Sequence, residues 1–241
     1  MKFIITDFKR GFTETTFLAS VGISLAVLVS SLGYYLLNET TYESTRAFMV
    51  CQSLILPFIA PLLATLPYSN MRMLEEDSGY HRLLAIKGNR KNYDFKRFLT
   101  NGVIGGMAIA LPLLLFAVIC RVFSPYESVQ QIVGIVILDF MFGFSYASIA
   151  YGLTFVNDKR YIPTVAPQVI YLLFIYAFPY LNLEAYYPPL SFAPWLLPSK
   201  IDGGNILMQF GVLIGLSLGL MILSKSYKWM KENIRRPGIN A

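Results

Sequence analysis

Residues 69–97 read SNMRMLEEDSGYHRLLAIKGNRKNYDFKR and form the only long polar stretch of the chain. The stretch carries seven Lys or Arg residues and four carboxylates, and the sequence on both sides of it is apolar. Charged groups at this density need water around them, because burying an unpaired charge is very costly. We therefore expect a structured, water-facing loop between two membrane spans.

A short helix is predicted inside this loop. Asp77 or Ser78 can cap its first turn, and Gly88 can supply the left-handed residue after its last turn. One face of this helix then carries the side chains of Tyr80, Leu83, Leu84 and Lys87. Asn92 can cap a second helix that runs directly into the apolar segment from Phe98, so we expect the loop to be rigidly joined to a span.

The composition favours a lipid bilayer as the solvent of this chain. Hydrophobic residues make up 55% of the 241 residues and charged residues 14%, against about 25% charged residues in a typical soluble domain. Six apolar segments each approach the roughly 20 residues that a helix needs to cross a bilayer. They cover residues 16–37, 47–68, 98–120, 132–155, 162–181 and 206–223. We predict an all-α membrane protein with six transmembrane helices in a single domain, residues 1–241.

The distribution of cations predicts the orientation. If the six segments alternate in direction, 17 of the 20 Lys and Arg residues fall on the side that holds both termini and residues 69–97. The opposite side holds only Arg46, Arg121 and Lys200. Because positive charge is retained inside the cell, both termini are predicted to be cytoplasmic in a multi-pass protein of the cell membrane. This placement accounts for the net charge of +6, so we expect no nucleic-acid partner.

The first twelve residues are too polar to span but have an amphipathic pattern. On a helical wheel one side carries Met1, Ile4, Ile5, Phe8 and Phe12. Lys2, Lys9 and Arg10 take the other side, which predicts a helix lying in the headgroup plane with its cations on anionic lipid. A disordered basic tail is the alternative.

Helix-breaking residues recur within the apolar segments. Kinks are expected at Pro57, Pro61, Pro112, Pro163, Pro167 and Pro179, because each proline removes an intrahelical hydrogen bond. Such kinks either line a pathway or serve packing. Residues 183–203, with four prolines and several aromatics, form either interface anchors or a re-entrant segment before the last span.

Glycines at intervals of four mark one face of the last span. Gly211, Gly215 and Gly219 form a small-xxx-small stripe, which lets another helix approach closely. The partner helix belongs either to this chain or to a second chain.

Asp139 is the only charged residue inside the six segments. A carboxylate at the centre of a span costs about 2.5–3.5 kcal/mol on insertion scales, so this group must be neutral or satisfied. A structural hydrogen bond and a role in a translocation pathway are both consistent with its position.

The residues needed for common catalytic sites are missing from the sequence. His81 is the sole histidine, so neither a histidine-based metal site nor a Ser-His-Asp triad can be built. No GxxxxGK[ST] motif occurs, so we expect no nucleotide binding by a P-loop on this chain. Cys51 and Cys120 have no metal-binding spacing, and buried thiols are favoured over a disulfide. We expect no enzyme activity and no cofactor on this chain.

The layout resembles the membrane permeases of ABC transporters of the ABC-2 exporter type. Those proteins combine an interfacial N-terminal helix, six spans with both termini inside, a coupling helix in the cytoplasmic loop between spans two and three, and a re-entrant region before the last span. The loop pattern of the family is matched by Glu75, Gly79, Leu83, Leu84 and Lys96. Tyr80 replaces the small hydroxyl residue that usually follows the glycine, and Gly88 stands where proline is common.

The resemblance implies a dimer of permeases, identical or paired with a sister chain, seated on two ATPase subunits that bind ATP and Mg²⁺. The contact with the ATPase would then involve Glu75, Glu76, Gly79, Tyr80, Leu83, Leu84 and Lys87. The implied cargo is amphipathic or hydrophobic, such as a peptide. Two other classes stay open, an ion-coupled secondary transporter and a non-transport membrane scaffold or assembly protein.

Overall fold

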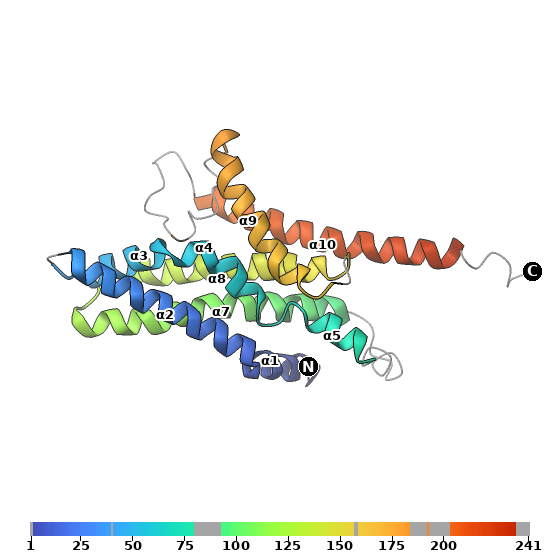
Figure 1. Cartoon of the computed structure of the whole chain (residues 1–241), viewed down its shortest axis with the longest axis horizontal. Helices are drawn as coiled ribbons and strands as arrows, with labels where there is room; N and C mark the ends of the chain where they lie inside the picture. The colour runs from blue at the N-terminus through green and yellow to red at the C-terminus, as the bar shows by residue number, and fades with distance from the viewer. Residues whose placement is uncertain are drawn as a thin grey trace, which may run out of the picture.

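The computed structural model describes residues 2–39, 41–79, 93–156, 159–183, 192 and 203–234. Every regular element in this part of the chain is a helix (Figure 1). The helices are α1 (Lys2–Thr13), α2 (Thr15–Asn38), α3 (Ser44–Leu54), α4 (Leu56–Thr65), α5 (Met71–Asp77), α7 (Tyr93–Phe123), α8 (Val129–Leu153), α9 (Ile162–Tyr180) and α10 (Gly203–Ile234).

Five of these helices, α2, α7, α8, α9 and α10, are long and apolar enough to cross a membrane. The pair α3 and α4 adds a sixth candidate span, bent by 68° at its break. The break falls at Ile55, two residues before Pro57, whose ring excludes the amide hydrogen bond that would continue α3. The kink predicted in segment 47–68 is therefore confirmed, whereas α7 and α9 continue through Pro112 and Pro167 without a break.

The helices α7 and α8 form the centre of the bundle and approach each other closely. An added Cβ on Gly143 of α8 would lie 2.7 Å from the carbonyl oxygen of Gly105 in α7, and one on Gly105 would lie 2.7 Å from that of Ala64 in α4, which also packs closely on α7. In the most apolar parts of α7 and α8, 61% of the residues are buried, against 33% in α2, 22% in α9 and 28% in the corresponding part of α10. The outer helices therefore present most of their surface to the surroundings.

One end of the bundle gathers charged side chains from segments far apart in sequence. Arg160, before α9, pairs with Asp77 of α5 at 2.6 Å, and Lys225 of α10 pairs with Asp94 of α7 at 2.6 Å. We call this end, formed by α1, α5, the start of α7, the last turn of α8 and the start of α9, the charged end. The start of α1 and the end of α10 lie toward this side of the molecule in Figure 1. Those residues predicted to share one membrane side that the structure describes are thus together at one end.

Candidate functional site at the charged end

The helix α5 lies near the start of the polar stretch 69–97 and is followed, after Ser78, by Gly79. Gly79 has a φ of +71°, a left-handed conformation that favours glycine, and its amide donates to the carbonyl of Glu76 at 3.2 Å. Asp77, predicted to cap the next helix, is the last residue of α5, and its carboxylate accepts hydrogen bonds from Arg160. Residues 80–92, which hold the predicted anchors Tyr80, Leu83, Leu84 and Lys87, lie outside the described residues.

Arg97, near the start of α7, is the centre of a buried polar cluster. Its side chain is 1% exposed, and its guanidinium forms a hydrogen-bonded ion pair with Glu75 of α5. It also lies 3.3 Å from the carboxylate of Asp7 in α1 and donates to the hydroxyl of Tyr68 at 2.6 Å. A single side chain therefore joins α1, the segment between α4 and α5, α5 and α7.

Both carboxylate oxygens of Glu75 are used within the chain. Oε1 accepts from Arg97 and from Arg10 at 3.1 Å, and Oε2 accepts from the hydroxyl of Tyr93 at 2.7 Å. Removing a carboxylate from water is costly, and the charge-assisted bonds of two guanidinium groups offset that cost. Glu75 is 4% exposed, so the structure places this predicted partner contact inside the chain. We call Arg97, Glu75, Asp7, Arg10, Tyr68 and Tyr93 the Arg97 cluster.

Asp7 is a carboxyl group of the cluster whose pKa is raised by burial. Burial raises the pKa of Asp7 from 3.8 to about 6, because the loss of hydration outweighs the attraction of Arg97, and the Glu75 carboxylate adds to the rise. One turn further along α1, Gly11 packs on Ile104 of α7 and on Tyr68. The face of α1 that carries Asp7 and Gly11 thus rests on the base of the bundle.

A second set of contacts ties α5 to α8. Arg72 donates to the backbone oxygen of Thr154 at 3.0 Å and to Glu76 at 2.7 Å. Its guanidinium carbon lies 3.5 Å from the ring centre of Phe155, a cation–π contact. Unlike its neighbour Glu75, Glu76 has 38% of its side chain exposed at the surface of the charged end. Together with the Asp77–Arg160 pair, these contacts connect α5 to the end of α8 and to the start of α9.

The remaining predicted site residues lie away from the charged end. Asp139 in α8 is fully buried, and neither carboxylate oxygen has a hydrogen-bond partner among the described residues. Gly211, Gly215 and Gly219 face open space, since a Cβ added at any of them would meet nothing within 4 Å. No described helix of this chain covers that stripe.

The sequence did not predict the long-range contacts of Asp7, Arg72 and Arg97. The two arginines entered the sequence analysis only as cations of the loop 69–97. The spacing of Asp7 and Gly11, four residues apart, was the available signal that both share one face of α1. Within the described residues, no group of three His, Cys, Asp or Glu side chains could hold a metal ion. The arrangement provides mechanical connection between α5 and the spans.

Comparison of the chain with protein-family models, with curated proteins and with solved structures finds no match in any of the three. The residues of the charged end, and the way in which they connect the spans, are therefore the basis for assigning a function.

Proposed function

We propose that this chain is the permease subunit of an ATP-driven exporter of the ABC-2 type, and that residues 69–97 couple it to a cytoplasmic ATPase subunit. The observation that carries the proposal is the fixation of α5. Glu75 binds α1 and α7, Arg72 binds the end of α8, and Asp77 binds Arg160 at the start of α9. A seven-residue helix held by so many charged contacts can transmit force from the loop to several spans.

The loop would act as a lever. Its described ends, α5 and the first turn of α7, are clamped together by Glu75, Arg97 and Tyr93. A displacement of residues 80–92 by a partner would therefore reach α7 directly. The apolar side chains Tyr80, Leu83 and Leu84 would dock into a groove of the ATPase, beside Lys87 and the exposed Glu76. Apolar side chains in a charged loop need such a partner surface.

The proposal also covers the nucleotide, the second permease and the cargo. ATP and Mg²⁺ would bind to the ATPase subunit, with no catalytic residue on this chain. Two permeases, either two copies or this chain with a sister chain, would meet in the cell membrane with both termini cytoplasmic. The uncovered stripe of Gly211, Gly215 and Gly219 supports a helix contact outside this chain. The cargo would be an amphipathic or hydrophobic molecule such as a peptide.

The docking claim is tested by the double variant Leu83→Ser/Leu84→Ser. The tagged chain is purified in mild detergent from cells that produce it natively, and nucleotide-binding proteins that accompany it are identified by mass spectrometry. Loss of two apolar anchors costs about 2 kcal/mol or more, which weakens binding by roughly thirtyfold. The ATPase should therefore be present with the wild type and absent from the double variant.

A matched control changes two leucines that follow α9 and are exposed in the structure, Leu181→Ser/Leu183→Ser. This control should retain the ATPase. Equal recovery of an ATPase with both double variants would contradict the docking site, and recovery of none with the wild type would contradict the permease assignment.

One observation favours a second candidate, the ion-coupled transporter. Asp139 is a fully buried carboxyl group in a span, and groups of this kind mark ion or proton pathways. Transport that stops with a protonophore and persists without ATP would favour this candidate. Loss of such transport in Asp139→Asn, with normal insertion in the membrane, would assign the coupling site.

A further inference from the structure

The side chain of Gln168 in α9 binds the backbone of α4. Its Oε1 accepts a hydrogen bond from the amide of Leu62 at 3.1 Å, and its Nε2 donates to the carbonyl oxygen of Phe58 at 2.7 Å. In a regular α-helix the amide of a residue donates to the carbonyl four positions earlier, so residue 62 pairs with residue 58. Gln168 therefore bridges the two backbone groups that an undisturbed α4 pairs with each other.

Pro61 explains why α4 accepts a side chain at this point. Pro61 lies inside α4, and its nitrogen carries no hydrogen for the carbonyl of Pro57. The proline ring also pushes against that carbonyl and opens the turn. In a membrane, neighbouring helices supply hydrogen bonds to a helix that a proline disturbs. The amide of Gln168 does this for α4 in the turn that contains Pro61.

The first turn of α9 is fixed by separate contacts. The hydroxyl of Thr65 donates to the backbone oxygen of Thr164 at 2.9 Å, and the amide of Asn70 donates to the hydroxyl of Thr164 at 2.9 Å. Neither bond involves Gln168. The first turn of α9 is therefore anchored independently of the contact between Gln168 and α4.

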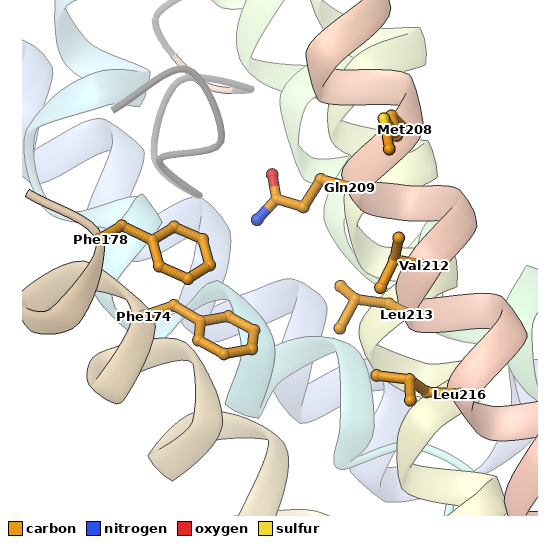
Figure 2. Close-up of a pocket in the computed structure, with 7 residues that line it drawn as sticks. All are labelled: Phe174, Phe178, Met208, Gln209, Val212, Leu213 and Leu216. Atoms are coloured by element: carbon orange, nitrogen blue, oxygen red, sulfur yellow. The ribbon is translucent and has the colours of Figure 1, made fainter. Parts of the chain in front are cut away.

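The half of α9 beyond Gln168 is loosely packed. The buried residues of α9 all lie between positions 163 and 171, and residues 172–180 are at least partly exposed. In Figure 1 α9 is strongly inclined to α7 and α8, and its last turns project beyond them. A cavity of about 160 Å³ lies between this half and α10, with Phe174 and Phe178 on one wall and Leu216 on the other (Figure 2). The outer half of α9 therefore has few buried contacts to hold it in place.

We propose that Gln168 is a latch between α4 and α9, and that α9 is a movable span that swings about its first turn when the latch opens. On opening, the Leu62 amide donates to the Phe58 carbonyl, so neither backbone group is left without a partner. Hydrogen bonds between helices in a membrane are individually weak, so the latch opens without loss of the bundle. The device lies within α4 and α9 and does not rest on the proposed ATPase contact.

The test measures the position of the end of α9 in the full chain, with both native cysteines replaced by alanine. Spin labels are placed at two exposed positions, Tyr180 at the end of α9 and Val122 near the end of α7. Pulsed electron paramagnetic resonance gives their separation in phosphatidylcholine nanodiscs, with labelled chain diluted by unlabelled chain. From Thr164 to Tyr180 α9 is about 24 Å long, so a rotation of about 10° moves position 180 by about 4 Å. The wild type should give one main distance, and Gln168→Leu a second distance shifted by about 4 Å or more.

Two controls separate the latch from a general loosening of the bundle. Val169→Leu changes the neighbouring, exposed position of α9 and should leave the wild-type distance unchanged. A label pair at Leu37, near the end of α2, and Val122 does not include α9. The distance of this pair should be the same in the wild type and in Gln168→Leu.

A second variant tests the link between the proline and the latch without changing Gln168. Pro61→Ala supplies an amide to the Pro57 carbonyl and closes the turn. Leu62 then pairs with Phe58, and the bridging position of Gln168 is lost. The second distance should therefore appear at the end of α9 in this variant also.

Three outcomes would overturn the proposal. The same distance distribution in the wild type and in Gln168→Leu would overturn the latch. A second distance in Val169→Leu, or a changed control pair in Gln168→Leu, would mean general loosening and would overturn the swing of α9. An unchanged distribution in Pro61→Ala would overturn the exchange of partners in α4. No ATPase takes part in these measurements, so failure here is distinguishable from failure of the proposed function.

Discussion

Arg97 of α7 and Glu75 of α5 form a buried ion pair that joins the two ends of the charged loop. Their side chains are 1% and 5% exposed, and 22 residues separate them in sequence. Tyr93 reinforces the pair by donating to the second oxygen of Glu75. The pair explains how a water-facing loop can hold a fixed position relative to the spans.

The first prediction concerns the stability of this pair. Glu75→Ala leaves the Arg97 guanidinium buried with one fewer counter-charge, and we expect a loss of about 3–5 kcal/mol. Chemical unfolding in detergent, followed by circular dichroism, measures this loss. Asp77→Ala is the matched control, because it breaks the exposed pair with Arg160 and should cost no more than about 1 kcal/mol. Similar losses in the two variants would contradict the central role of Glu75.

The second prediction concerns pH. Asp7 has a folded-state pKa of about 6 against 3.8 in the unfolded chain. The folded state therefore binds more protons between these values, and this contribution to stability is present below about pH 4 and is lost as pH rises through 6. Asp7 faces Arg97, Arg10, Glu75 and Tyr68. Comparing the wild type with Asp7→Asn isolates the titration of Asp7, because the asparagine side chain does not ionise.

For that comparison, melting temperatures are measured from pH 5 to pH 7.5. The wild type should lose stability relative to Asp7→Asn as pH rises, because only the wild type ionises a buried carboxyl group. A growing advantage of the wild type at high pH would instead mean that the ion pair with Arg97 outweighs burial.

The third prediction separates two kinds of glycine. Gly105→Ala should destabilise the protein by about 1–3 kcal/mol, because the new methyl group meets the carbonyl of Ala64 at 2.7 Å. Gly215→Ala meets nothing within 4 Å and should be neutral or stabilising by up to about 1 kcal/mol within one chain. Equilibrium unfolding of the dilute monomer in detergent measures both. A destabilised Gly215→Ala monomer would place the stripe in contact with its own chain.

The fourth prediction concerns sidedness. Both native cysteines are buried, so they should not react with an impermeant maleimide. A cysteine at position 90 should be labelled from the cytoplasmic side only, and one at position 183, which follows α9, from outside only. Labelling of position 90 by the impermeant reagent in intact cells would contradict the predicted topology.

The membrane character, the positions of the apolar helices and the break near Pro57 could be predicted because each depends on local sequence, whereas α10 extends to Ile234, beyond the predicted end at residue 223. Span length follows from consecutive apolar residues, and Pro57 acts within one turn. The roles of Glu75 and Glu76 could not be separated in this way. The two adjacent glutamates differ by about 100° on the helix, which turns Glu75 inward and leaves Glu76 at the surface.

The partnership of Asp7 with Arg97 also escaped prediction, for a different reason. The two residues are 90 positions apart, and only the packing of α1 through Gly11 on Ile104 brings them together. On the sequence alone, Asp7 was one carboxylate among cations on a helix expected at the membrane surface. Long-range ion pairs of this kind depend on tertiary structure and leave no local pattern.

The central claim, that the charged loop contacts an ATPase, is tested most directly by photo-crosslinking from position 84. Benzoylphenylalanine is introduced there, and at position 181 as a control, in cells that produce the protein natively. After irradiation we predict a covalent adduct between position 84 and a nucleotide-binding subunit, and none from position 181. No such adduct from position 84, or equal adducts from both positions, would contradict the proposed contact between the charged loop and an ATPase.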